Sequence, residues 1–278
     1  MKKIISLLLA VVLCFGCAAA LASCSGETIV SKIGVQKGTT SKFYADLLKG
    51  VEVVPYDTFP LAVTDLKNGN VDYAIVDKST AKALCAEIDG LKIMDNIPLS
   101  TEYYGIGIDP AQEGLKAQID AILAEHAEEI EAIKEKYTNN EEDKFVGITS
   151  AAKDVNKASE QLVVATNAEF PPFEYKEGTQ YYGIDMEIAK IIADELGLEL
   201  VIEDMDFDNV VGSVGKQGID IAMSGITITA ERLDVINFSE PYYTEAIVVV
   251  CNEDDDSFAK CGTVVDLLTV ICMPADEE

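Results

Sequence analysis

The residues best suited to binding chemistry lie close together, between Ser224 and Arg232, where the chain reads Ser-Gly-Ile-Thr-Ile-Thr-Ala-Glu-Arg. A guanidinium group is a planar fork of N–H donors that matches a carboxylate, and partial burial strengthens such a pair. Thr227 can add a hydroxyl and a backbone N–H, while Gly225 lets the backbone approach a ligand closely. The alternative for Arg232 is a surface residue in the first turn of a helix that pairs with Glu231 or Asp234. The residue types of this motif are suited to holding a carboxylate.

A second candidate group lies about 190 residues earlier in the chain. Gly38, Thr39 and Thr40 stand where an expected strand enters a helix, and unpaired backbone N–H groups at a helix start favour an anion. Thr40 would add a hydroxyl, although it could also be a plain N-cap. Asp77 ends an apolar run, and its alternative role is the N-cap of a helix that begins near Ser79. These residues form a second candidate binding group.

Both groups occur in segments that resemble one protein family. The run from Ser224 to Tyr243 is similar to the ligand-gripping segment of the bacterial extracytoplasmic amino-acid-binding proteins (solute-binding family 3), and Ile33–Thr40 resembles a second segment. The resemblance implies a periplasmic-binding-protein-like α/β fold: two lobes, each a mostly parallel sheet flanked by helices, with the ligand cleft between them. It also implies that Arg232 binds the α-carboxylate of a free amino acid and Asp77 its α-ammonium, without cofactor, metal or catalysis.

The same resemblance supplies aromatic walls for the cleft. Phe170 is expected to pack over the ligand side chain, and Phe207 matches a second wall. Asn167 and Glu169 lie beside Phe170 in the sequence and would read the polarity of the ligand side chain. The alternative is a proline-stiffened turn whose aromatic rings cap the core, which we favour for Phe173.

The two halves of the family pattern appear in reversed order, which predicts a circular permutation. We expect the family's original ends to be joined by a linker, and one of the two crossovers between the lobes to be interrupted. The predicted parts are the second lobe at 30–97, a hinge crossover and return segment at 98–137, a linker at 138–160, the first lobe at 161–251, and an acidic remnant of the other crossover at 252–278.

Short apolar runs alternate with helical patterns through both halves, which is typical of parallel sheets covered by helices. Tyr103–Ile108 is expected to be one strand, and Ala246–Cys251 to be the last strand of the first lobe. Apolar residues recur at helical spacing over 111–136. The single histidine, His126, lies on that apolar stripe and is predicted to pack at its boundary.

The first residues read as a targeting segment. Lys2 and Lys3 precede an apolar run that is too short to span a membrane. The sequence Leu-Ala-Ser-Cys that ends at Cys24 resembles a bacterial lipoprotein signal, which predicts a signal peptide at 1–23 and lipidation of Cys24. The alternative is ordinary secretion, with cleavage near Ala18–Ala20. Either way, the mature protein is expected outside the cytoplasm, and lipidation would anchor it to the cell membrane.

Composition narrows the function further. The chain has 278 residues and 49% hydrophobic residues, enough for two lobes, and its formal net charge of −28 argues against nucleic-acid binding. Four cysteines lie beyond the targeting segment, and Cys251 and Cys261 flank an acidic loop and could form a disulfide. No cysteine or histidine spacing indicates a metal site.

The sequence therefore predicts capture of a free amino acid for the membrane permease of an ABC-type importer. Two alternatives remain open at this point. One is a dehydratase-like enzyme on the same fold, with Glu169 as general acid or base. The other is a rearranged chain that needs a second copy to complete its fold.

Overall fold

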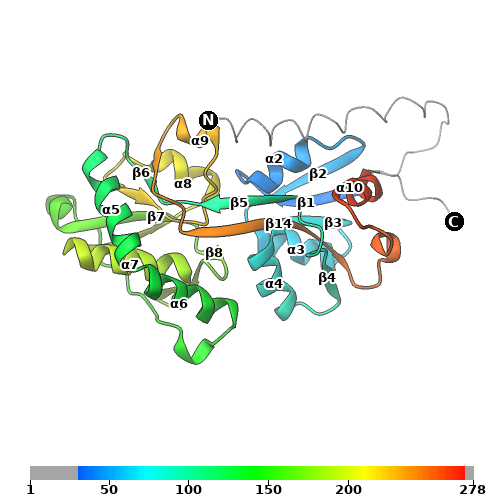
Figure 1. Ribbon diagram of the computed structural model, residues 1–278, viewed down its shortest axis with the longest axis horizontal. Helices are drawn as coiled ribbons and strands as arrows, with labels where there is room; N and C mark the ends of the chain where they lie inside the picture. Colours follow the sequence, from blue (N-terminus) through cyan, green and yellow to red (C-terminus); the bar gives the residue numbers. More distant parts are fainter. Residues whose placement is uncertain (1–30, 273–278) are drawn as a thin grey trace.

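Two lobes joined by a pair of strands make up residues 31–272, the part of the chain that the computed structural model describes (Figure 1). Lobe A comprises residues 31–104 and 243–272, and lobe B comprises residues 105–242. The two joining strands run side by side between the lobes in Figure 1. The predicted signal peptide at 1–23 and the lipidation site at Cys24 lie outside the described residues.

Lobe A is built on a six-stranded sheet with the order β2-β1-β3-β14-β4, in which β5 also pairs with β14. β1 is parallel to β2 and β3, whereas β14 is antiparallel to β3, β4 and β5. The strands are β1 Ser31–Gln36, β2 Val51–Tyr56, β3 Tyr73–Asp77, β4 Leu91–Ile93, β5 Ser100–Tyr104 and β14 Tyr243–Asn252. The helices are α2 Thr40–Asp46, α3 Phe59–Lys67, α4 Lys78–Glu87 and α10 Val264–Cys272, with a 3-10 turn at Asp256–Phe258.

Lobe B has a five-stranded sheet with the order β11-β7-β12-β6-β13 and a small sheet with the order β10-β9-β8. β7 is parallel to β11 and β12, and β6 is antiparallel to β12 and β13. The strands are β6 Gly107–Ile108, β7 Gln161–Thr166, β8 Glu169–Phe170, β9 Glu174–Glu177, β10 Gln180–Tyr182, β11 Glu199–Asp204, β12 Ile221–Ala222 and β13 Asn237–Phe238. The helices are α5 Glu113–Glu125, α6 Ala127–Thr138, α7 Ile184–Leu196, α8 Phe207–Ser213 and α9 Ala230–Leu233, with 3-10 helices at Glu142–Lys144 and Val155–Glu160.

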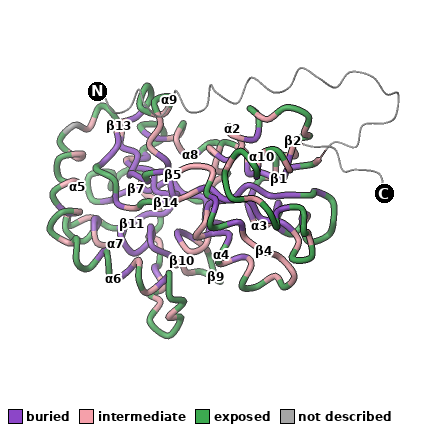
Figure 2. The backbone as a smooth tube through the Cα atoms, turned by 45° about the vertical axis from the view of Figure 1, so that its right-hand side comes forward, coloured by how far each residue is buried: buried purple, intermediate pink, exposed green. Residues whose placement is uncertain are grey.

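Buried side chains follow the strands through the middle of both lobes (Figure 2). All five residues of β3 and all six of β7 are buried, as expected for strands with helices on both faces. The two-lobed α/β architecture predicted from the sequence is thus present. Within residues 31–272, no helix combines the length and the apolar character that a membrane span requires.

The expected single strand Tyr103–Ile108 is instead two strands in two different sheets. β5 pairs with β14 in lobe A, and β6 pairs with β12 and β13 in lobe B. The chain passes between the lobes at Gly105, where an added Cβ would lie 2.8 Å from the Ile228 side chain. The sequence from Tyr103 to Ile108 carries no mark of this change of sheet.

The predicted boundary of the first lobe at residue 251 is wrong, because β14 belongs to lobe A. Its Ile247–Val250 segment pairs with β3, and its final residues pair with β4, so β14 lies inside the lobe A sheet. A run of apolar β-branched residues suits such a central strand equally well in either lobe. Since β5 and β14 both cross between the lobes without a break, the predicted interruption of one crossover is also wrong.

The segment predicted as a remnant, residues 252–278, contributes to the core of lobe A as far as it is described. Leu267 and Ile271 of α10 are fully buried and pack in one cluster with Ile33 and Val35 of β1. Phe258, in the preceding 3-10 turn, meets the ring of Tyr73 edge to face, with centroids 5.2 Å apart. The acidic residues at 253–256 led to the prediction of a remnant, but the segment that follows them packs against the lobe A sheet.

The predicted linker at 138–160 connects α6 to β7 but lies against lobe B along its length. The Phe145 ring stacks on Tyr137 at 4.2 Å, and Ile148 forms an isolated bridge with Tyr181. The hydroxyl of Ser150 accepts a hydrogen bond of 2.8 Å from the backbone N–H of Ile202. These contacts make the segment part of the lobe rather than a free tether.

The cysteines and the histidine also differ from expectation. Cys251 and Cys261 are free, so the predicted disulfide is wrong: Cys251 is buried within the lobe A sheet, and burial raises its pKa to about 12. His126 does not pack at an apolar boundary. Its ring lies between Glu129 and Glu195, with nitrogen–oxygen distances of 2.9 and 3.2 Å.

Candidate functional site

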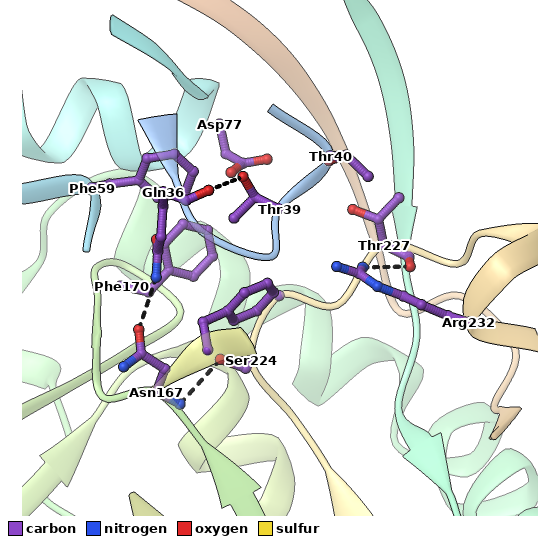
Figure 3. A pocket seen from close by; sticks show the side chains of 12 residues that line it. Gln36, Thr39, Thr40, Phe59, Asp77, Asn167, Phe170, Ser224, Thr227 and Arg232 are labelled. Carbon is purple, nitrogen blue, oxygen red and sulfur yellow. Dashed lines mark hydrogen bonds between the residues drawn. The ribbon is translucent and has the colours of Figure 1, made fainter. Parts of the chain in front are cut away.

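Residues from both lobes line one pocket at the lobe boundary (Figure 3). The pocket encloses about 300 Å³ of empty space, including space open to solvent. Lobe A contributes Gln36, Thr39, Thr40, Phe59 and Asp77, and lobe B contributes Asn167, Phe170, Phe207, Ser224, Gly225, Thr227 and Arg232. The fold therefore brings together the two residue groups that the sequence separates widely.

Glu169 is the one predicted ligand residue that the fold leaves outside this lining. It is exposed, whereas the adjacent Phe170 is buried. The two residues form the short strand β8, and consecutive side chains of a strand point to opposite faces. Phe170 therefore faces the pocket, and Glu169 faces solvent.

Arg232 reaches the pocket from α9, whose N-cap Thr229 accepts a bond from the backbone N–H of Arg232. Its Nη1 donates to the carbonyl oxygen of Thr227 at 2.8 Å, and its Nη2 donates to that of Gly38 in lobe A at 3.0 Å. The guanidinium carbon lies 5.7 Å from the ring centroid of Phe207. Within residues 31–272, Arg232 makes no salt bridge, so its charge is available to an anionic ligand.

Burial and nearby acids shift the pKa of Arg232 in opposite directions. Desolvation lowers the pKa of Arg232, while the carboxylates of Glu102 and Asp77 raise it. The guanidinium remains the cation of the pocket, since an arginine stays charged in proteins.

A buried acid supports the lobe B floor of the pocket. The hydroxyl of Ser224 donates to Glu174 Oε1 at 2.5 Å and accepts from the backbone N–H of Asn167 at 3.1 Å. Burial, followed by the charge of Asp185, raises the pKa of Glu174 well above its ordinary value. The carboxyl group thereby fixes both Ser224 and Asn167.

A second buried acid holds the glycine beside it. Asp185 Oδ2 accepts from the backbone N–H of Gly225 at 2.9 Å, and the hydroxyl of Tyr242 donates to the same carboxyl group at 2.8 Å. Burial raises the pKa of Asp185 to about 7. Gly225 has φ +52°, and an added Cβ would lie 2.5 Å from the Phe170 ring, so only glycine fits here.

Asp77 stands at the end of β3 and is 5% exposed. Its Oδ1 accepts a 2.8 Å bond from the hydroxyl of Tyr104, and its side chain makes no capping bond to α4. Burial, and then the charges of Glu102 and Glu245, raises its pKa well above the ordinary value. The helix-capping alternative therefore does not apply to this side chain, which lines the pocket instead.

The two threonines at the start of α2 have different roles. Thr39 is the N-cap: its Oγ1 accepts from the backbone N–H of Lys42 at 3.2 Å and donates to the carbonyl oxygen of Gln36 at 2.7 Å. Thr40 is the first helical residue, and its hydroxyl donates to Glu102 Oε2 at 2.8 Å. The N-cap alternative considered for Thr40 thus belongs to Thr39.

Three residues of the site were not identified from the sequence. Gln36 Nε2 donates to Asn167 Oδ1 at 3.1 Å, and the rings of Phe59 and Phe170 lie 5.7 Å apart, both across the lobe boundary. Glu102 lies behind the pocket on β5. Gln36 falls inside the recognised segment, whereas neither Phe59 nor Glu102 has a distinguishing sequence pattern.

Comparisons with known proteins find similarity to one family over part of the chain. The model of bacterial extracellular solute-binding proteins, family 3, matches residues 162–272. The arginine-binding extracellular protein ArtP of Bacillus subtilis is 38% identical over 94 residues, which cover 34% of this chain and 37% of that protein.

Two further relatives differ in what their names describe. The arginine-binding periplasmic protein of Mannheimia haemolytica is 32% identical over 108 residues, 38% of this chain and 45% of that protein. The cyclohexadienyl dehydratase of Pseudomonas aeruginosa is 35% identical over 96 residues, 34% of this chain and 36% of that protein. The chain thus spans less than half the length of each of these three relatives.

Proposed function

We propose that the chain is a member of family 3 of the bacterial extracellular solute-binding proteins, whose model matches residues 162–272, and that it binds a free amino acid outside the cytoplasm for an ABC-type importer. One observation carries this proposal. Arg232 of lobe B and Asp77 of lobe A line the same pocket. An α-amino acid carries a carboxylate and an ammonium on one carbon, so a cation and an acid on facing walls match both groups.

We propose a cationic amino acid, and L-arginine first, as the ligand. The acids Asp77 and Glu102 both act on Arg232, which among residues 31–272 is the one cationic residue that lines the pocket. A second positive charge on the ligand would balance this surplus of acid. The rings of Phe170 and Phe207 suit a guanidinium, which stacks well on aromatic faces. The arginine-binding relatives point in the same direction.

Closure of the lobes about β5 and β14 is the proposed mechanism of capture. Gln36–Asn167 and Arg232–Gly38 are hydrogen bonds between the lobes at the pocket itself. A ligand that binds more tightly when both walls are in place shifts the population toward the closed form.

We also propose that the lobe order is a circular permutation and that one copy suffices. A Cβ on Gly50 would lie 3.5 Å from the carbonyl oxygen of Cys272, and the neighbouring Val51 pairs with Ser31. The two limits of the described region therefore lie close together in lobe A, as such a rearrangement requires. β14 already completes the lobe A sheet, so a second copy is not needed for it. A monomeric mass in solution would support this proposal, and an obligate dimer would contradict it.

The remaining elements of the proposal concern location. Lipidation of Cys24 would hold the protein at the outer face of the cell membrane, next to the permease that receives its ligand. Labelling with a radioactive fatty acid tests this step, and loss of label in Cys24→Ser is the expected result.

The enzyme alternative has less support, even though one relative is a dehydratase. Glu169, the residue suggested as its acid or base, is exposed and outside the pocket lining. Thermal shift and calorimetry with the standard amino acids test the binding proposal, because a ligand of the native state raises the melting temperature. We expect saturable binding of L-arginine. Turnover of a prephenate-like acid, or no response to any amino acid, would contradict it.

A further inference from the structure

Glu102 occupies a position where the hinge and both lobes meet. It lies on the crossing strand β5, directly opposite Glu245 of β14, and is 4% exposed. Its Oε2 accepts hydrogen bonds from the hydroxyl of Thr40 in lobe A at 2.8 Å and from that of Thr227 in lobe B at 2.5 Å. One carboxylate oxygen thus joins the two lobes.

We propose that Glu102 is a latch, a positioning residue that favours the closed arrangement of the lobes through Thr40 and Thr227. Each threonine hydroxyl has one hydrogen to donate, and Glu102 accepts both. Both hydrogen bonds are shielded from water, because Glu102 is buried. Any motion that separates Thr40 from Thr227 must break at least one of them.

The latch differs from the other contacts between the lobes in where it lies. Gln36–Asn167, Arg232–Gly38 and Phe59–Phe170 all use side chains that line the pocket, where a ligand would disturb them. Glu102 is not among the lining residues. The acceptor of the latch therefore lies behind the pocket lining, while its two donors, Thr40 and Thr227, are part of that lining. The latch favours the closed form as long as both hydroxyls donate to Glu102.

The consequence for binding rests on the proposed function. If the binding-competent closed form is more populated before the ligand arrives, the apparent affinity rises by the same factor. Loss of the two hydrogen bonds should lower affinity by about ten- to a hundredfold. The ligand's own contacts with Arg232 and Asp77 would be unchanged.

Replacement of Glu102 in the full chain tests the latch directly. Small-angle scattering of the ligand-free protein should give a larger radius of gyration for Glu102→Ala than for the wild type, and calorimetry should give weaker binding of L-arginine. Glu102→Gln should recover most of both properties, because both hydroxyls donate to one oxygen and an amide oxygen can accept both.

Glu245→Ala is the matched control. Glu245 is a buried acid on the opposite hinge strand, and its bonds go to the backbone N–H groups of Ser79 and Ala246, both within lobe A. It should leave the dimensions of the ligand-free protein unchanged. If Glu102→Ala does not fold, Thr40→Val removes one half of the latch at a partly buried position and should widen the protein in the same way.

Three results would overturn the latch: wild-type dimensions of the ligand-free protein in both Glu102→Ala and Thr40→Val, equal changes in Glu102→Ala and Glu245→Ala, or no recovery in Glu102→Gln. The last result would assign the effect to the charge of Glu102 rather than to its bonds. If the wild type binds no amino acid, the proposed function fails, and the scattering of the ligand-free variants still decides whether the latch exists.

Discussion

The two walls of the pocket are supported in different ways. In lobe B, two wall residues are held by buried acids of the same lobe: Ser224 by Glu174, and Gly225 by Asp185. In lobe A, two wall residues bond to the crossing strand or to the other lobe. Thr40 bonds to Glu102 on the crossing strand β5, and Gln36 bonds to Asn167 across the boundary.

We infer from this difference that the two lobes contribute differently to ligand binding. A wall whose groups are already fixed binds with little loss of side-chain freedom, so lobe B should supply most of the affinity. The wall in lobe A takes its final geometry from contacts with the hinge and with lobe B. Lobe A should therefore supply selectivity and closure.

Arg232→Ala should cause the largest loss, because it removes the only lining cation from the fixed wall. Loss of a partly buried charged contact costs about 2–5 kcal/mol, enough to abolish measurable binding. Arg232→Lys should bind nearly as poorly, since a lysine lacks the planar fork. Calorimetry measures the affinity, and circular dichroism should show an unchanged fold. Undiminished affinity in either variant would refute the site in lobe B.

Asp185→Asn should change how stability depends on pH. The pKa of Asp185 is raised to about 7 in the folded protein, while an unfolded aspartate titrates near its ordinary value of about 3.9. Between these values the folded state holds a proton that the unfolded chain has released. Stability should therefore fall as pH rises from about 4 to about 7, by at most about 1.4 kcal/mol per pH unit, and then level off.

Urea unfolding of the wild type and Asp185→Asn at several pH values measures this difference. The asparagine variant should show a shallower slope, because it lacks the contribution of Asp185, while Glu174 and Asp77, whose pKa values are also raised, contribute in both proteins. Acids elsewhere, such as Asp65, are common to both proteins and cancel in the comparison. Parallel curves for the two proteins would show that folding does not raise the pKa of Asp185.

Much of the lobe B wall could be predicted from the sequence because its residues are adjacent in the chain. Ser224, Gly225, Thr227 and Arg232 fall within nine residues, and one loop places them all at the pocket. Asp77 and Thr40 were also found, since each stands where an apolar run meets a helix. Local signals of this kind survive a change in the order of the lobes.

What the sequence did not reveal depends on pairing between distant segments. The apolar run of β14 fits a buried strand in either lobe, and only its pairing with β3 and β4 assigns it to lobe A. In the sequence, Glu102 looks like an ordinary strand residue. Its role depends on hydrogen bonds from Thr40 and Thr227, which are far from it in the chain. The prediction for Glu169 was wrong for a simpler reason. Consecutive side chains of a strand point to opposite faces, so Glu169 faces solvent while Phe170 faces the pocket.

Asp77→Asn should have a smaller and more selective effect, on the wall that lobe A contributes. An asparagine cannot supply a negative charge to the α-ammonium, so amino acids should lose about tenfold in affinity. The matching carboxylic acids without the amine should be unaffected. Competition assays with paired ligands measure this selectivity. Equal losses for both kinds of ligand would assign Asp77 a structural role through its bond with Tyr104.

The smallest effect is expected from a change in chain order. A variant in which residues 31–137 follow residue 272 through a short connection, with the chain opened at 138, restores the order of the two lobes. Both crossing strands, β5 and β14, are continuous in either order, and the new connection lies within lobe A. The latch, the hinge and both walls of the pocket should therefore have the same structure in both chain orders. We expect equal affinity for L-arginine and equal dimensions in scattering. Tighter binding and a more compact ligand-free form in the variant would contradict this expectation. They would show that connecting residue 272 to residue 31 makes lobe A more rigid.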